Sequence, residues 1–260
     1  GRTGFAHLGI TESGAADKWA MRCANALVGN AESEPVLEIT LGGFAFTSGC
    51  DVSLAVTGAK APLLLNDTPV DQYQTIKLHK GDRFEIKPAS QGARLYLAAS
   101  GGFDTERLFG SASTCTREGL GYALSVGDNL TLLIPTITDS VALSVDQIPQ
   151  FKRSIRLGLV KGLQSHLYDW QAFNRFFQTR FEVSPLTDRM GCRLIADTPI
   201  KPPIGGIRSE GINLGAVQIP ADGHPIIMLN DHQTIGGYMK IGSICRADLS
   251  LLAQATPGTE

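Results

Sequence analysis

The sequence predicts a mainly β protein with a few helices. Its apolar residues come in short runs, most of them rich in β-branched or aromatic residues, and Gly, Asn, Asp or Lys-Gly turns separate the runs. The 260 residues include 29 glycines and 13 prolines but only 18% charged residues, which favours many short strands joined by tight turns. Only three segments have the pattern of a helix.

The first half is predicted to hold one helix and a run of strands. Asp17 or Ser13 can cap the start of the helix, and Gly29 can end it. Apolar residues at helical spacing predict its buried face: Trp19, Cys23, Ala26 and Leu27. The strands expected next, as in an all-β barrel or sandwich, are residues 36–40, 44–47, 52–57, 75–78, 83–86 and 93–99. Glu38 interrupts the first of these strands and is expected on its solvated face, the alternative being a pairing inside a site.

The second half alternates strands with two short helices. Its strands are predicted at 154–160 and 181–183, while a last strand of the first half is predicted at 129–134 and residues 135–150 are the expected connection between the halves. Residues 169–177 predict a helix whose stripe of Trp170, Phe173 and Phe177 faces the core. A final helix over 248–253 has Asp248 as its expected cap.

The stretch from 209 to 242 predicts a hairpin that ends in a site. Apolar runs at 216–219 and 225–229 flank the turn 220–223, whose Asp-Gly pair favours a tight connection. Five polar residues, 230–234, follow the second run directly. Polar side chains at the exit of a buried strand are typical of a binding or catalytic loop.

Composition excludes several classes of protein. A net charge of −2 gives no basic surface for nucleic acid or an acidic membrane. No apolar run approaches the roughly 20 residues of a membrane helix. Five scattered cysteines without a CxxC pair favour reduced thiols over disulfides or zinc. With no signal-like region, and with ends that look trimmed, we expect a cytoplasmic chain.

The polar residues match no common catalytic motif, and the five histidines lack metal-ligand spacing, so no metal site is predicted. On an extended segment Asp231 and Gln233 would share a face, and His232 would point away as a surface or satisfied histidine. With Gln218 from the facing run, these groups suit a planar amide or urea-like ligand. Lys240 and Arg189 could supply positive charge to a phosphate or oxyanion. The alternative, held to be equally good, is a polar rim whose groups satisfy one another.

The loop before the first helix has two interpretations. Residues 11–17 could bind an anion or carboxylate at the helix N-terminus, with Ser13 and Asp17 in the site. They could instead only cap the helix, which is the interpretation that the sequence favours.

The chain resembles the family of the 5-oxoprolinase C component, also described as the KipA or allophanate-hydrolase-subunit-2 family. The resemblance runs nearly end to end and is carried by GRTGFAHLGITESGAAD, ANALVGN, LEITLGG, LAVTGA, ARLYLAASGGFD, SPLTDRMGCRL and SEGINLGAVQIPADGHPIIMLNDHQTIGGYMKI. It implies two cyclophilin-like β-barrel halves, 1–147 and 148–260. It also implies work with a partner, the B component, in the ATP-dependent opening of the lactam of 5-oxoproline, for which Mg²⁺ is expected.

The resemblance implies roles for residues that the strand exits already single out. Asp231 and Gln233 would orient the lactam, and Lys240 and Arg189 would contact phosphate or oxyanion. The residues expected to bind substrate or ATP are Ser13, Asp17, Asp188, Ser209, Glu210, Gln218, Thr234, Gly236, Gly237 and Tyr238. Two alternatives stay open: a carboxyltransferase of a biotin-dependent urea or amide carboxylase, and a regulatory protein that binds a partner.

Overall fold

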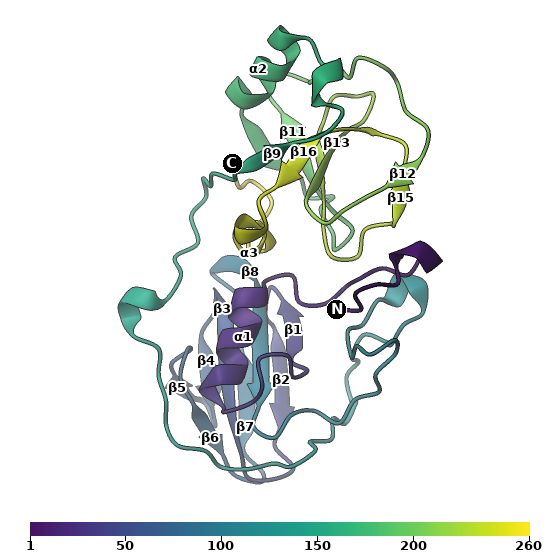
Figure 1. Cartoon of the computed structure of the whole chain (residues 1–260). Helices are drawn as coiled ribbons and strands as arrows, with labels where there is room; N and C mark the ends of the chain where they lie inside the picture. Colours follow the sequence, from purple (N-terminus) through teal and green to yellow (C-terminus); the bar gives the residue numbers. More distant parts are fainter. The chain divides into compact units, whose positions relative to one another are not determined.

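The computed structural model describes residues 1–260, and its strands far outnumber its three α-helices, which confirms the mainly β class (Figure 1). The chain forms two compact units that each combine distant segments. Unit 1 consists of Gly1–Ala16, Ser113–Tyr122 and Lys152–Glu260, and unit 2 of Asp17–Ala112 and Ala123–Phe151. The expected halves 1–147 and 148–260, each a cyclophilin-like barrel, stay a prediction. None of the helices has both the length and the apolarity that crossing a bilayer requires.

Unit 2 contains two four-stranded antiparallel sheets. The first has the order β1 (Leu37–Thr40), β8 (Gln91–Ala99), β3 (Val52–Lys60) and β6 (Ile76–Leu78). The second has the order β2 (Phe44–Thr47), β7 (Arg83–Ile86), β4 (Leu63–Leu65) and β5 (Thr68–Val70). Side chains from both sheets, among them the fully buried Leu54, Phe84 and Leu95, form one core. The six strands predicted in this half are confirmed, and β2 and β7 have the predicted bounds.

Helix α1 (Lys18–Leu27) lies along β3 and β8 (Figure 1). Asp17 caps it, because its side chain accepts a hydrogen bond from the Ala20 amide. The predicted buried stripe is confirmed only at Leu27: Trp19 is 41% exposed, and the other buried apolar residues are Ala20 and Ala24. Small alanines allow the helix to lie close to the sheet, whereas an indole would hold it away.

Three expectations for unit 2 need correction. The hairpin of β4 and β5 was not predicted, although Asn66 and Asp67 take the positive φ values of 49° and 63° that a tight turn requires. Residues 129–134 form no strand, and only an isolated bridge joins Leu132 to Phe103. Glu38 is not solvated, because it accepts a hydrogen bond from the Tyr96 hydroxyl at 2.8 Å and lies 3.6 Å from the Arg94 guanidinium.

Unit 1 contains a six-stranded antiparallel sheet and a two-stranded ribbon. The sheet order is β10 (Phe181–Val183), β11 (Gly191–Ala196), β14 (Ile226–Met228), β13 (Ala216–Ile219), β16 (Met239–Ile244) and β9 (Leu159–Lys161). The ribbon pairs β12 (Glu210–Gly211) with β15 (Ile235–Gly236). The predicted hairpin is confirmed: the Gly223 amide donates to the Pro220 carbonyl at 3.0 Å, and φ of Gly223 is 80°.

Helices and a second core complete unit 1. Helix α2 (Trp170–Gln178) is confirmed, but its buried aromatic residue is Phe176, while Trp170 is 79% exposed. Helix α3 (Leu249–Ala253) is confirmed too, but Asp248 does not cap it: this carboxylate accepts from the Gly158 amide at 2.6 Å. Of the strand predicted at 154–160, only its end belongs to β9. Short 3₁₀ turns are η1 (Ala6–Leu8), η2 (Thr116–Glu118), η3 (Val145–Gln147), η4 (Ser165–Leu167) and η5 (Arg246–Asp248).

The thiol of Cys192 should be unreactive in the folded chain. All five cysteines are free, and burial raises the pKa of Cys192 to about 11. Since the thiolate is the nucleophile, roughly one Cys192 thiol in a thousand is ionised at pH 8. After an iodoacetamide pulse at pH 8, peptide mass spectrometry should find the half-buried Cys245 modified well before Cys192. Equal rates in the native protein, or no gain at Cys192 on denaturation, would contradict this prediction.

Candidate functional site

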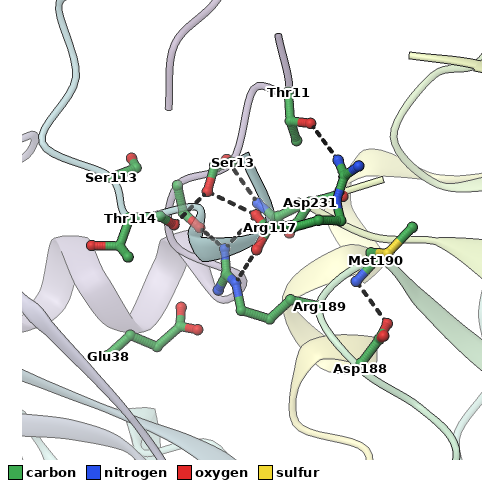
Figure 2. A network of polar contacts seen from close by, with 12 residues as sticks. Thr11, Ser13, Glu38, Ser113, Thr114, Arg117, Asp188, Arg189, Met190 and Asp231 are labelled. Carbon is green, nitrogen blue, oxygen red and sulfur yellow. Dashed lines mark hydrogen bonds and ion pairs between the residues drawn. The ribbon is translucent and has the colours of Figure 1, made fainter. Parts of the chain in front are cut away.

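An ion pair between Arg189 and Asp231 forms the centre of a polar network in unit 1 (Figure 2). Asp231 lies in the turn after β14, and Arg189 lies in the turn before β11. Arg189 Nε donates to Asp231 Oδ2 at 2.8 Å and Nη2 donates to Oδ1 at 3.1 Å, which is the bidentate arrangement that suits a guanidinium and a carboxylate. Arg189 Nη2 also donates to the Gly14 carbonyl at 2.8 Å, so the pair fixes the N-terminal loop.

Ser13 joins this pair from the N-terminal loop (Figure 2). Its hydroxyl lies 2.7 Å from Asp231 Oδ1 and 3.0 Å from the Thr114 carbonyl oxygen. A hydroxyl has a single proton, and the shorter contact to a charged acceptor is the stronger hydrogen bond. Ser13 has a φ of 55°, a strained backbone conformation that non-glycine residues adopt mainly at sites where their surroundings impose it. Asn230 supports it, since their backbones bond at 3.0 Å and the Asn230 amide reaches the Ala15 carbonyl at 3.1 Å.

A third segment, which the sequence analysis missed, completes the network. Arg117 Nη2 lies 2.9 Å from Thr11 Oγ1, 2.8 Å from Glu118 Oε1 and 3.1 Å from the Asp231 carbonyl oxygen. Glu118 accepts hydrogen bonds from the Thr11 amide, at 3.0 Å, and from its hydroxyl. The Arg-Glu pair within a run of small residues was the one available signal. Burial raises the pKa of the neighbouring Cys115 thiol, and the charge of Asp231 raises it further.

Two further residues predicted for the site, Asp188 and Asp17, accept hydrogen bonds from backbone amides close to them in the sequence. Asp188 orders the turn, because its Oδ1 accepts from the amides of Met190 at 2.8 Å and Gly191 at 3.0 Å. Asp17 belongs to unit 2, where it caps α1. The structure therefore joins Asp231, Arg189 and Ser13 in one network within unit 1, and Asp188 only orders the turn that carries Arg189.

The segment after Asp231 is not extended, and the expectation based on alternating faces fails. Residues 230 and 231 form a turn, and the next strand begins only at Ile235. His232 is 8% exposed and is therefore not a surface residue; its Nδ1 lies 2.7 Å from the Gln233 carbonyl oxygen, which confirms the alternative of a satisfied histidine. A carbonyl only accepts, so Nδ1 is the donor in this contact. The Gln233 side chain is half-buried and has no hydrogen-bond partner among residues 1–260.

Lys240 belongs to a second cluster of unit 1. Its ammonium forms an ion pair with Glu210 and donates to the Gly211 carbonyl at 3.2 Å. Its backbone amide donates to Gln164 Oε1 at 2.7 Å, and the Gln164 amide group bonds to Glu210. The hydrogen bond from Lys240 lowers the pKa of Glu210. Gln218 faces Lys240 across the β13–β16 pair and belongs to this cluster.

The other candidates lie along the same ribbon. Ser209 directly precedes β12, and Gly236 pairs with Glu210 across the ribbon. The Thr234 carbonyl accepts from the Ile212 amide at 2.9 Å, and the Gly237 carbonyl accepts from Ile207 at 2.8 Å. Tyr238 is 45% exposed. These hydrogen bonds are made by backbone groups and hold the ribbon in place. The exposed side chain of Tyr238 is accessible to a ligand.

The network around Asp231 can recognise a polar, uncharged donor. An ionised carboxylate offers about four acceptor positions, of which Ser13 and Arg189 use three. The residual acceptor position of Asp231 suits an N–H donor of a ligand. Arg117, whose side chain is 39% exposed, adds positive charge nearby.

Known proteins resemble this chain over nearly its whole length. The family model described as "Carboxyltransferase domain, subdomain A and B" matches residues 8–260. The chain belongs to this family. It is 34% identical over 262 residues to the C component of 5-oxoprolinase from Escherichia coli and 35% identical over 269 residues to that from Haemophilus influenzae, and covers 84% of each. The resemblance to the family of the 5-oxoprolinase C component is thereby confirmed.

Larger relatives contain the same region. The chain is 28% identical to the urea amidolyase of Saccharomyces cerevisiae, of which it covers 15%. In a crystal structure of TTHA0988 a matching region superposes with a TM-score of 0.90 at 33% identity. A crystal structure of the Kluyveromyces lactis urea amidolyase gives a TM-score of 0.87 at 28% identity. The chain spans about half of the TTHA0988 chain (52%) and 17% of the urea amidolyase chain.

Breaking the central ion pair should destabilise unit 1. Arg189→Met leaves the carboxylate of Asp231, whose side chain is 11% exposed, without its main partner, at a cost of about 3 kcal/mol. Arg193→Met, an exposed site on the adjoining β11, should change the free energy of unfolding by less than about 0.5 kcal/mol. Urea unfolding of both variants checks this. Equal stabilities would show that the pair does not organise the network.

Proposed function

We propose that this chain is the C component of an ATP-dependent 5-oxoprolinase, which acts with a B component to open the lactam of 5-oxoproline to glutamate. The observation that carries the proposal is the sequence identity of 34% and 35% to the C components of two 5-oxoprolinases, over nearly the whole chain. The polar network of unit 1 supports it, because it offers the groups that a lactam requires.

The ligand has three recognisable groups: a lactam N–H, a lactam carbonyl and a carboxylate. The free acceptor position of Asp231 suits the N–H, and the donor end of the Gln233 carboxamide suits the carbonyl. Asp231 is held by Arg189 and Ser13, so it is oriented before a ligand binds. Pre-ordered polar groups lose little entropy on binding and can stabilise the charge that develops when the ring opens.

The cations have different proposed roles. Arg189 is committed to Asp231, so we assign it a positioning role in place of direct phosphate contact. Arg117 is the group proposed to offer positive charge to ATP phosphates or to a developing oxyanion. ATP would be a co-substrate with Mg²⁺. The partner component, the cytoplasmic location and the two cyclophilin-like barrels belong to the same proposal.

Gln233→Ala should impair turnover without unfolding the chain. Loss of one hydrogen bond to the lactam should lower kcat/KM by roughly tenfold to a hundredfold. The matched control is Gln171→Ala, an exposed glutamine on α2. The measurement is ATP-dependent glutamate formation from 5-oxoproline by the chain with its partner components. If the complete complex forms no glutamate, the proposed function is wrong; if it does but Gln233→Ala is fully active, only the role of Gln233 is wrong.

A biotin-dependent carboxyltransferase acting on urea or a related amide is the second candidate. The description of the matching family model and the 28% identity to urea amidolyase favour it. Urea also presents N–H and carbonyl groups, so the same network would serve. Carboxylation of urea in the presence of biotin carboxylase and a biotinylated carrier, with no turnover of 5-oxoproline, would select this candidate. A purely regulatory protein would bind a partner and catalyse neither reaction.

A further inference from the structure

The β13–β16 pair places two polar side chains on one face of the sheet, and one of them is buried without a hydrogen-bond partner. Gln218 and Lys240 are direct partners in the antiparallel register, so their side chains share a face. Gln218 is 1% exposed, yet its Nε2 has no hydrogen-bond partner among residues 1–260. A buried polar group without a partner costs free energy, and in a native protein it calls for an explanation such as a functional role or a bound water or ion.

The ribbon of β12 and β15 closes over these side chains. A Cβ atom on Gly236 would lie 3.1 Å from Gln218 Nε2, so the Gly236 backbone passes directly beside the carboxamide. Gly236 pairs with Glu210, and the Glu210 carboxylate forms the ion pair with Lys240. Gln218, Lys240, Gly236 and Glu210 therefore lie together, and the carboxylate bound to Lys240 is that of Glu210.

Burial and charge distinguish the two partners of this ion pair. The Lys240 side chain is 13% exposed, whereas that of Glu210 is 45% exposed and lies on a two-residue strand. A cation inside the protein needs a counter-charge, but an exposed carboxylate can return to water at small cost. Glu210 is therefore the exchangeable partner, and Lys240 is the fixed one.

We propose that Lys240 and Gln218 form a carboxylate-binding subsite, and that Glu210 occupies it as an internal ligand until a small-molecule carboxylate displaces it. An incoming carboxylate would take the Lys240 ammonium with one oxygen and the orphaned Gln218 Nε2 with the other. The identity of that ligand rests on the proposed function: the carboxylate of 5-oxoproline is the group that this subsite would hold. Competition from Glu210 lowers the apparent affinity to the intrinsic affinity multiplied by the fraction of molecules in which the subsite is free.

Two ligands, three single variants and one double variant test the subsite by calorimetric titration of the full chain. The ligands are 5-oxoproline and 2-pyrrolidinone, which has the same lactam but no carboxylate. Glu210→Gln removes the internal carboxylate, so it should bind 5-oxoproline roughly threefold to tenfold more tightly than the unmodified chain, with 2-pyrrolidinone unchanged. Lys240→Met should abolish the preference for 5-oxoproline over 2-pyrrolidinone. Glu182→Gln, an exposed glutamate on β10, is the matched control and should change neither affinity.

The outcomes separate the subsite from the proposed function. Failure of Glu210→Gln to tighten 5-oxoproline binding, an equal gain for 2-pyrrolidinone, or no binding of 5-oxoproline to any form overturns the subsite even if the complete complex makes glutamate. Tightening by Glu210→Gln that is lost in the Glu210→Gln/Lys240→Met double variant supports the subsite even if that complex makes no glutamate.

Discussion

The bidentate pair of Arg189 and Asp231 is the interaction on which the network of unit 1 depends. A carboxylate that is almost removed from water must be compensated by donors, and here Arg189 and Ser13 supply three hydrogen bonds to it. The same pair draws together segments that are far apart in the sequence, because Arg189 also holds Gly14 and the Asp231 backbone holds Arg117. The groups are mutually dependent, so loss of one donor weakens the positions of all the others.

Much of the fold could be predicted because its signals are local. Strands β2, β7, β10 and β13 have the predicted bounds, since turn residues and β-branched or aromatic runs mark both ends. The failures are non-local. Residues 129–134 carry an equally good apolar run, but a strand also requires a partner along its length, and Leu132 has only a single bridge. Trp19 was wrongly predicted on the buried face of α1, because close packing on β3 and β8 selects alanines over the larger indole.

The polar network of unit 1 was also predicted only in part, because some of its signals are local and some of its contacts are not. Asp231 and Arg189 could be named because polar residues at strand exits are a local signal. Arg117 and Glu118 could not, because Glu118 lies 107 residues from its partner Thr11 in the sequence and nothing in either segment alone indicates the contact. His232 is the satisfied histidine that the sequence allowed and not a surface one, because the turn at residues 230 and 231 removes the alternation of faces that a strand would have.

The two ion pairs of unit 1 differ in how easily a ligand could replace the carboxylate: the pair of Arg189 holds the structure, and the pair of Lys240 can exchange its partner. Arg189 presents a planar fork that fits both oxygens of Asp231, so a competing ligand would have to replace several bonds at once. Lys240 presents a compact charge to a single oxygen of the exposed Glu210, and one carboxylate can replace another there with little rearrangement. A guanidinium at position 240 would hold Glu210 in two contacts and slow its release. Lysine at this position therefore fits a subsite that a ligand must open, whereas arginine at position 189 fits a pair that must stay closed.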